Sequence, residues 1–251
     1  MKSLLLGALL ALSLPAFAAD PAADKAIQDA VANPARTADD RTRDGRDKPA
    51  EVLAFAGVKP GMTVADVFSA GGYYTELLAG VVGPTGKVLA IDNLGYATFS
   101  KDERKVRYAE GRLKNVDRRL IEASWFDVGQ HTVDIAFLVM AFHDTYWVDE
   151  KSGWAAINND GFIESLRRML KPGGRLVIVD HNAPAGTGRE QAQKVHRLNE
   201  DFVKKTLAAH GFVYEKSYDG LRSKNDQYDK YVYDEAVKGK TDRYVLMFKV
   251  K

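Results

Sequence analysis

The sequence predicts an α/β domain whose seven strands form a doubly wound, mostly parallel sheet, closed by an antiparallel pair. Three observations predict this fold class. Short apolar runs alternate with helical patterns over residues 50–210. The run 133–140 is almost entirely apolar, which is typical of a central strand covered on both faces. Two β-rich runs, 212–218 and 243–250, have only a polar insertion between them, which favours a closing strand pair.

The other strands are expected where short apolar runs end at glycine, proline or polar residues. They cover 63–68, 87–91, 119–122 and 175–180. Helical patterns lie between these strands, and a further one opens at Pro49 and ends before Gly57. The helices between strands are expected over residues 74–82, 101–113, 161–170 and 190–210. No internal repeat or second domain is evident.

The composition excludes several kinds of site. The chain has 251 residues, of which 45% are hydrophobic, and it contains no cysteine. Disulfides, thiolate metal sites, iron–sulfur clusters and a cysteine nucleophile are therefore ruled out. Its 36 basic and 34 acidic residues nearly balance, so bulk charge does not predict a nucleic-acid partner.

The first eighteen residues have the pattern of a secretory signal peptide. Lys2 precedes an apolar run over residues 4–14, which is too short to span a bilayer as a stable helix. Ala16-Phe17-Ala18 then matches a signal peptidase site, so we expect cleavage after Ala18 and export to the periplasm. The alternatives are a buried core helix or an uncleaved anchor. Residues 19–50 are expected to be a largely solvated leader or cap, and residues 51–251 the functional domain.

Two motifs carry a resemblance to a known family. Residues 66–75, DVFSAGGYYT, resemble the first motif of class I S-adenosylmethionine-dependent methyltransferases, and residues 171–176, KPGGRL, resemble the turn into their fifth strand. More narrowly, the chain resembles a family of exported bacterial predicted methyltransferases. The shared segments are 46–61, HDTYW at 143–147, His196-Arg197 and KGKTDR at 238–243. The resemblance implies a Rossmann-like methyltransferase fold and S-adenosylmethionine as cofactor.

The resemblance also implies where the cofactor binds. The usual pattern would place glycines at positions 68, 70 and 72, whereas this chain has Phe68, Ala70 and Gly72, with a further glycine at 71. Phe68 is the serious departure, because a bulky residue resists positive φ and fills space. Asp92 ends the second strand, where this architecture carries an acid for the ribose hydroxyls. The cofactor-binding residues implied are Asp66, Ser69, Ala70, Gly71, Gly72, Asp92, Asn93, Ser124 and Trp125.

Each of these assignments has a structural alternative. Asp92 could cap the segment that follows it. Trp125 and Phe126 could be core aromatics rather than neighbours of an adenine.

Polar residues at the carboxyl ends of two strands are the candidates for the acceptor side. They are His143, Asp144, Tyr146 and His181. A histidine there could deprotonate an acceptor hydroxyl or amine, although His143 could equally only brace a loop. The histidines show no metalloprotease spacing; a metal held by His143, Asp144 and His181 was weighed, but no metal site is assigned.

Two functions from different classes fit these features. The first is an exported methyltransferase acting on a small-molecule or envelope acceptor, and Asp92 at the expected distance favours it. The second is a non-catalytic periplasmic ligand-binding protein on a degenerate methyltransferase scaffold, and Phe68 favours that. The tyrosines of the insertion before the last strand could line a pocket, form a lid or pack on the terminal strands. The sequence does not indicate an oligomeric state.

Overall fold

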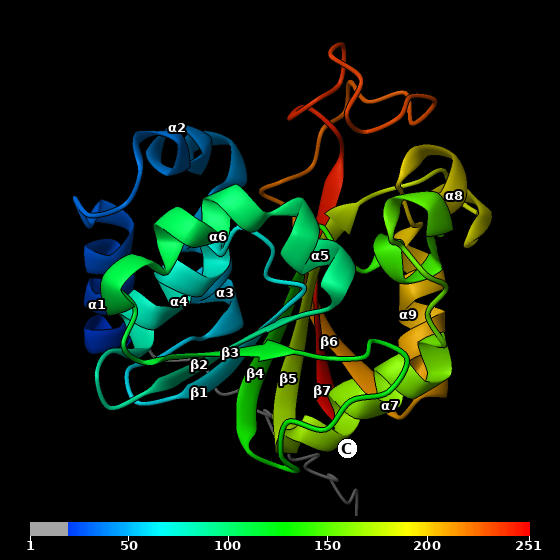
Figure 1. The fold of residues 1–251 in the computed structure, drawn as a ribbon. Coiled ribbons are helices and arrows are strands. Elements are labelled where there is room, and N and C mark those ends of the chain that lie inside the picture. The colour runs from blue at the N-terminus through cyan, green and yellow to red at the C-terminus, as the bar shows by residue number, and fades with distance from the viewer. Residues whose placement is uncertain (1–19) are drawn as a thin grey trace, which may run out of the picture.

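The computed structural model describes residues 20–251, so the predicted signal peptide lies outside the described residues. Seven strands form one sheet in the order β3-β2-β1-β4-β5-β7-β6, which confirms the predicted fold class (Figure 1). Their bounds are β1 Thr63–Val67, β2 Lys87–Asp92, β3 Val116–Leu120, β4 Val133–Val139, β5 Leu170–His181, β6 Phe212–Tyr218 and β7 Arg243–Val250.

The first five strands are parallel, and the last two are antiparallel to their neighbours. Val67 at the end of β1 pairs with Ile91 of β2 on one side and with Leu138 of β4 on the other. The carboxyl ends of the parallel strands therefore meet at one edge, which is where open α/β sheets bind ligands. β7 lies between β5 and β6.

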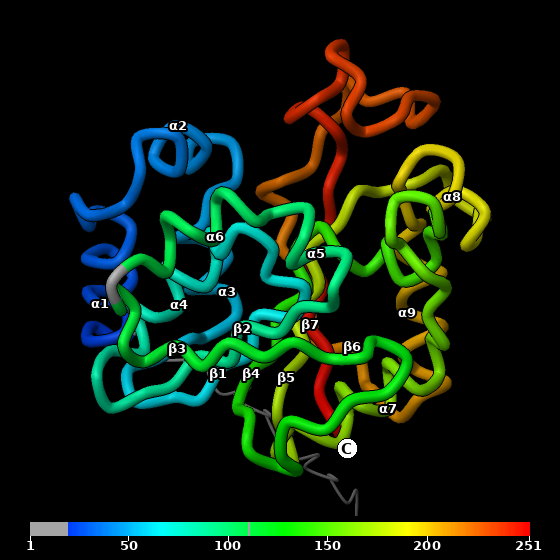
Figure 2. Tube along the Cα trace, in the orientation of Figure 1, coloured from blue at the N-terminus to red at the C-terminus, as the bar shows by residue number. Residues whose placement is uncertain are grey.

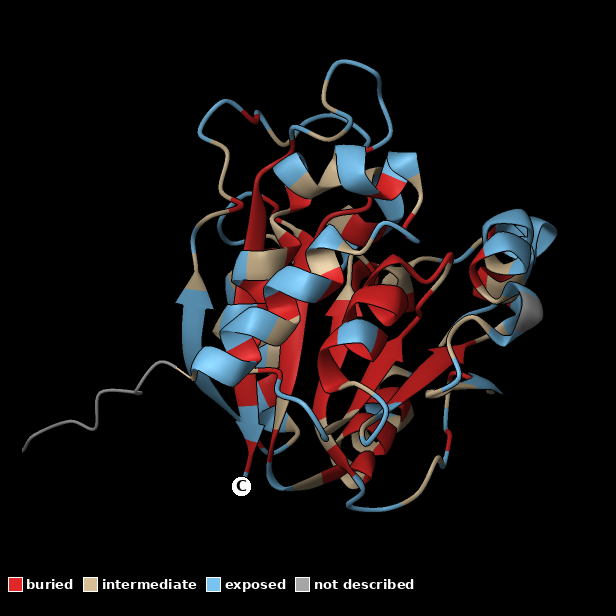
Figure 3. Ribbon diagram, turned by 90° about the vertical axis from the view of Figure 1, so that its left-hand side faces the viewer, coloured by how far each residue is buried: buried red, intermediate tan, exposed pale blue. Residues whose placement is uncertain are grey.

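Helices cover both faces of the sheet, because side chains of successive strand residues point to opposite sides. One apolar cluster joins the sheet to α1, α3 and α4, and the other joins it to α5, α7 and α9. The buried residues concentrate in the strands and in the helix faces toward them (Figure 3). The helices are α1 Pro21–Ala32, α2 Ala38–Asp47, α3 Pro49–Ala56, α4 Tyr73–Val82, α5 Leu94–Phe99, α6 Lys101–Arg107, α7 Asn159–Met169, α8 Glu190–Val195 and α9 Glu200–Ala209, with 3-10 turns at Ala109–Gly111, His143–Tyr146 and Glu150–Ser152.

The long helix predicted over residues 190–210 is wrong, because the structure has two helices there. His196 ends α8 in the left-handed conformation, with φ of 53°, which turns the chain out of the helix. Asn199 then starts α9, because its side chain accepts hydrogen bonds from the backbone N–H groups of Asp201 and Phe202. His196 consequently lies at a bend between two helices instead of on a helix surface.

Two further predictions around β3 are corrected. The strand predicted over 119–122 lies earlier, at Val116–Leu120, because this edge strand is largely exposed and carries the polar run Asp117-Arg118-Arg119. The helix predicted over 101–113 ends at Arg107, and the short helix α5 before it was not predicted. Asn93, expected to contact the cofactor sugar, caps α5 by accepting from the backbone N–H of Tyr96 at 3.0 Å.

The segment expected to be a solvated leader folds onto the domain as α1 and α2. Ile27 and Ala30 of α1 are buried, and Gly80 of α4 lies so close that a Cβ on it would stand 2.8 Å from the Cβ of Ala30. At the end of α2, Asp47 is buried and accepts from Arg243 Nη1 at 2.8 Å. This ion pair joins the first helices to the start of β7.

The insertion between β6 and β7, residues 219–242, stands above the carboxyl edge of the sheet (orange to red in Figure 2). It is anchored by Arg197, which is fully buried and donates to both oxygens of Asp226, at 2.7 and 3.1 Å. Arg197, which belongs to the shared segment His196-Arg197, is thus a buried anchor. Within residues 20–251, no helix has both the length and the apolar character that a membrane span needs.

Asp47→Asn is expected to destabilise the protein by about 3 kcal/mol at pH 7, because it leaves the buried Arg243 guanidinium without its counterion. Paired cations hold the pKa of Asp47 below its ordinary value, despite the opposing effect of burial. The stabilisation is therefore present above about pH 4 and is lost as the pH falls toward the folded-state pKa. Urea unfolding of Asp47→Asn and of Asp39→Asn, an exposed control on the same helix, measures this. Equal stability of the two variants would contradict it.

Candidate functional site

The turn after β1 is strongly bent. Phe68, Ala70 and Gly72 all have positive φ, at 58°, 48° and 79°. For non-glycine residues this conformation costs roughly 1 kcal/mol or more, so the surroundings must hold it in place. Phe68 therefore does adopt the backbone conformation that the usual glycine would provide, and its side chain has to go elsewhere.

Asp92, at the end of β2, holds this turn together. Its carboxylate accepts from the backbone N–H of Ala70 at 2.9 Å and from the Ser69 hydroxyl at 2.7 Å. Arg104 of α6 also donates to the carboxylate, which is completely buried. The acid predicted to bind a ribose is thus placed against the turn, and its side chain caps no helix.

Side chains of α6 and the residue after it cover the two glycines. A Cβ on Gly71 would lie 1.7 Å from Glu103 Oε2, and one on Gly72 would lie 2.7 Å from the Tyr108 hydroxyl. Arg107 donates to the carbonyl of Gly71 at 3.0 Å. The glycines are needed here because neighbouring side chains approach the backbone closely.

The ring of Phe68 is buried in an aromatic stack on the α5 and α7 side of the sheet. Its centroid lies 4.6 Å from that of Tyr96 and 5.2 Å from that of Phe162. Phe126 belongs to the same buried cluster, as the structural alternative for the aromatics after β3 anticipated. Phe68 fills the space between these segments.

Ser124 and Trp125 point elsewhere. The Ser124 hydroxyl accepts from the backbone N–H of Asn158, just before α7, at 3.1 Å. Trp125 is 52% exposed, and its ring lies 5.6 Å from the guanidinium of Arg168. Neither contacts the glycine turn, so the structure does not bring these two predicted residues together with the others.

Asp66 of β1 is buried beside the turn and accepts from the Thr75 hydroxyl at 2.6 Å. Burial raises the pKa of this carboxyl to about 7, and the nearby charge of Asp92 adds to the effect, whereas the hydrogen bonds from Thr75 oppose it. The sequence predicted that Asp66 would bind the cofactor. In this structure its partner is a neutral hydroxyl.

A second group of polar side chains lies beyond the ends of β4 and β5. Asp180, at the end of β5, accepts from His143 through the backbone N–H at 2.9 Å and faces the ring Nδ1 at 2.6 Å. It also accepts from the backbone N–H of His181. Sequence reasoning missed Asp180, although its position at the end of an apolar strand directly before His181 was a usable signal.

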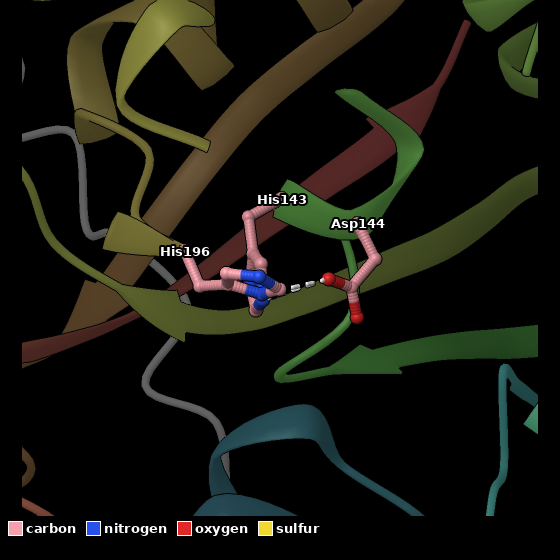
Figure 4. Close-up of side chains that lie close together, drawn as sticks. All are labelled: His143, Asp144 and His196. Carbon is pink, nitrogen blue, oxygen red and sulfur yellow. Dashed lines mark ion pairs between the residues drawn. The ribbon is translucent and has the colours of Figure 1, made fainter. Parts of the chain in front are cut away.

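Asp144 faces both His143 and His196. Its Oδ1 lies 3.1 Å from His143 Nε2 and 3.2 Å from His196 Nδ1 (Figure 4). Its Oδ2 accepts from the Tyr96 hydroxyl at 2.5 Å. These three side chains, His143, Asp144 and His196, are close enough to share one metal ion. The sequence missed His196 in this group, because a continuous helix would have carried it elsewhere.

The charges of this group determine the protonation of its histidines. Burial alone would lower the pKa of His143, but the carboxylates of Asp144 and Asp180 outweigh it and raise that pKa to about 10. Burial lowers the pKa of His181 well below its ordinary value, and the charge on His143 lowers it further. At neutral pH His143 is therefore an imidazolium, which does not fit the expected pKa near neutrality for a proton acceptor.

The two remaining acceptor candidates differ in position. The ring of His181 lies 5.8 Å from that of His143, and its Nδ1 is 2.7 Å from the Thr241 hydroxyl. Tyr146 instead packs toward α9, with its ring 5.5 Å from that of Phe202. Three of the four predicted residues thus lie together, and Tyr146 lies apart.

Tyr96 joins the two halves of the site. Its ring stacks on Phe68 of the glycine turn, and its hydroxyl donates to Asp144 of the histidine group. The turn and the histidine group are therefore separated by one side chain.

Asp66→Asn is expected to remove a pH dependence of stability. Between about pH 4 and pH 7 the folded protein holds a proton on Asp66 that the unfolded chain releases, so stability falls as the pH rises, by about 1.4 kcal/mol per unit. The variant has no such proton. The difference in free energy of unfolding, variant minus parent, should therefore increase with pH across this window and stay constant at higher pH. Urea unfolding across a pH series measures this, with Asp24→Asn, an exposed aspartate of α1, as control. A constant difference between Asp66→Asn and the parent would contradict the expectation.

Comparisons with known proteins agree with this architecture. Residues 58–236 match the model of a family described as a methyltransferase domain. The chain is 28% identical over 148 residues to the ubiquinone/menaquinone biosynthesis C-methyltransferase UbiE of Teredinibacter turnerae, covering 59% of this chain and 54% of that protein. It is 30% identical over 127 residues to an arsenite methyltransferase of Halobacterium salinarum, covering 51% and 29% respectively.

The chain spans about half the length of the curated relatives it matches. Among solved structures, a SAM dependent methyltransferase from Aquifex aeolicus superposes with a TM-score of 0.58 at 22% identity, covering 91% of this chain and 98% of that one. That likeness shows a shared fold. Because the family model spans well over half of the chain, this protein belongs to the methyltransferase domain family.

Proposed function

We propose that this protein is an exported methyltransferase that moves a methyl group from S-adenosylmethionine to a small-molecule or envelope acceptor. Family membership supports methyl transfer, and the Aquifex aeolicus relative in its fold is described as SAM dependent. The observation that carries the proposal is Asp92, a fully buried carboxylate at the end of β2 that lies against the turn after β1. That is the position from which an acid binds ribose hydroxyls in this architecture.

The residues of the turn fit such a cofactor in kind. Gly71 and Gly72 carry no side chains of their own, although Glu103 and Tyr108 cover them, and the Asp92 carboxylate already accepts from Ser69, Ala70 and Arg104. Arg104 competes for that carboxylate, with 15% of its side chain exposed. Ribose binding therefore requires that Arg104 release Asp92, which a shift of the short helix α6 would allow.

When bound, the cofactor supplies a methyl group on a positively charged sulfur. The protein would contribute mainly position, since methyl transfer needs the acceptor in line with that sulfur. His143, Asp144 and His181 lie beyond Tyr96 from the turn, so they would orient the acceptor. His181 is partly exposed and its Nδ1 is held by Thr241, which leaves Nε2 to accept a hydrogen bond from the acceptor. Tyr146 is proposed as an acceptor-side residue on the sequence alone, because in the structure its side chain packs toward α9.

One observation favours the second candidate, a non-catalytic ligand-binding protein. Phe68 is 3% exposed and fills the space between the turn, α5 and α7. If that ring and the Arg104–Asp92 pair stay in place, the turn has no room for a nucleoside. The two candidates therefore differ in whether the cofactor binds at all.

Titration calorimetry with S-adenosylhomocysteine is expected to show binding by the parent and about tenfold tighter binding by Arg104→Gln, because the substitution frees Asp92 for the ribose. Asp92→Asn is expected to weaken binding at least tenfold, since a charged acceptor contributes about 1.5–3 kcal/mol. Arg119→Gln, which removes an exposed arginine paired with Asp117, is the control and should leave affinity unchanged. Absence of binding by both the parent and Arg104→Gln at millimolar ligand would reject the methyltransferase in favour of the second candidate.

Export is tested separately. Expressed in a Gram-negative host, the full chain is expected in the periplasmic fraction with Ala19 as its first residue, because Ala16 and Ala18 fit a signal peptidase site. Ala18→Tyr should block cleavage and leave Met1 in place. N-terminal sequencing of each fraction measures this. Parent protein that stays in the cytoplasm with residues 1–18 attached would refute export while leaving the proposed reaction untouched.

A further inference from the structure

We propose that His143 Nε2, Asp144 Oδ1 and His196 Nδ1 bind a divalent transition-metal ion such as Zn²⁺. The ligands come from two segments, the 3-10 turn after β4 and the bend between α8 and α9. Figure 4 shows the two imidazole rings next to each other, facing the Asp144 carboxylate. One ligand atom from each side chain lies within 4.8 Å of the others.

Several polar atoms of this group make no well-aligned hydrogen bond. His143 Nε2, Asp144 Oδ1 and both ring nitrogens of His196 are buried, and none of their contacts has hydrogen-bond geometry, although Asp144 Oδ1 lies at ion-pair distance from both rings. Buried polar atoms without aligned partners are unusual, so several in one place need an explanation. The atoms are near one another but poorly aligned for hydrogen bonding, as expected when they point at a common ion.

The distances fit such an ion. Two ligands about 2.1 Å from a metal, at 90–109° to each other, lie about 3.0–3.4 Å apart. The separations of Asp144 Oδ1 from His143 Nε2 and from His196 Nδ1 are 3.1 and 3.2 Å. Two of the three separations therefore match coordination as they stand, and the third, between the two ring nitrogens, is within 4.8 Å and would shorten to about 3.4 Å or less on binding.

Neighbouring residues orient two of the three ligands. The Asp180 carboxylate, 2.6 Å from His143 Nδ1, accepts a hydrogen bond from that nitrogen and directs Nε2 toward the group, where a bound metal would displace the second proton of the imidazolium. Tyr96 donates to Asp144 Oδ2, which leaves Oδ1 facing the two histidine rings. Carboxylate–histidine contacts of this kind are usual in the outer shell of metal sites.

The backbone and ring contacts of His196 hold it toward the group. It adopts the left-handed conformation, which is strained for a non-glycine residue. Its ring lies 4.7 Å from that of Trp147 and 4.9 Å from that of Tyr231, and these contacts fix its direction. A strained and buried imidazole that faces a carboxylate without a hydrogen bond is what a metal ligand held ready for its ion requires.

The donor set selects the class of ion. Two imidazoles with one carboxylate suit zinc and its first-row neighbours, whereas Mg²⁺ and Ca²⁺ prefer all-oxygen sites. Three protein ligands leave at least one position for a water or an acceptor oxygen. His181, weighed from the sequence as a third ligand, is paired with Thr241 instead.

The test uses the full chain, without an affinity tag, stripped of metal by a chelator. Calorimetric titration with Zn²⁺ is expected to show one tight site per chain, and titration with Co²⁺ to give visible absorption from a low-symmetry site. Mg²⁺ should not compete. No high-affinity site in the parent overturns the proposal.

Variants show whether the ion sits in this group. His196→Gln and Asp144→Asn are each expected to weaken Zn²⁺ binding by about a hundredfold or more, and circular dichroism checks that each folds. His210→Gln is the matched control, because His210 lies outside the group and contacts the exposed Asp160. Since His196 makes no side-chain hydrogen bond, its replacement should not unfold the protein. Binding unchanged in both variants would place the ion elsewhere and refute the site. The result does not depend on methyl transfer, because no cofactor enters the experiment.

Discussion

Buried carboxylates at one edge of the sheet are the constraint on which the rest of the site depends. Asp66, Asp92 and Asp180 stand at or near the ends of β1, β2 and β5, and each is almost fully buried. A buried charge is costly unless it is paired or protonated, so each needs a group from outside the sheet. Asp66 has the Thr75 hydroxyl, Asp92 has the Arg104 guanidinium, and Asp180 has the His143 ring. The elements that carry these partners, α4, α6 and the turn after β4, are positioned accordingly.

The site also depends on the contact between its two halves. Tyr96 lies against Phe68 on one side and donates to Asp144 on the other. A ligand that displaced the Phe68 ring would also disturb Tyr96, and the hydrogen bond to Asp144 would respond. Changes at the turn are therefore expected to reach the histidine group through a single side chain rather than through the sheet.

The sequence predicted most buried strands well and most exposed segments poorly. β7 matches its predicted bounds, and the run predicted for β4 is one residue too long, because burial imposes a strong pattern on these segments. β6 also matches its predicted bounds, although most of its residues are exposed. β3 and α6 are largely exposed. Their polar residues give no hydrophobic pattern from which the first and last residues of either element could be predicted. The break at His196 was missed because helical periodicity continues through it, although Asn199 followed by two acids was a usable start signal.

For the site, positions at strand ends could be read from the sequence, but partners could not. Asp92 and His143 lie where the order of strands predicted. Arg104 reaches Asp92 across 12 residues of sequence, Asp180 reaches His143 across 37, and His196 reaches Asp144 across 52. Such contacts depend on how the helices pack. No local pattern encodes that packing.

The order of strands has a consequence for how the sheet is completed. β6 comes before β7 in sequence, yet within residues 20–251 β7 is its only neighbour in the sheet, and β7 in turn pairs with β5. A chain cut short before Arg243 would thus lose two strands instead of one, because β6 would have nothing to pair with. The same cut would remove one of the cations paired with Asp47 and weaken the attachment of α2. The segment that begins at Arg243 thus holds both β6 and the end of α2 in place.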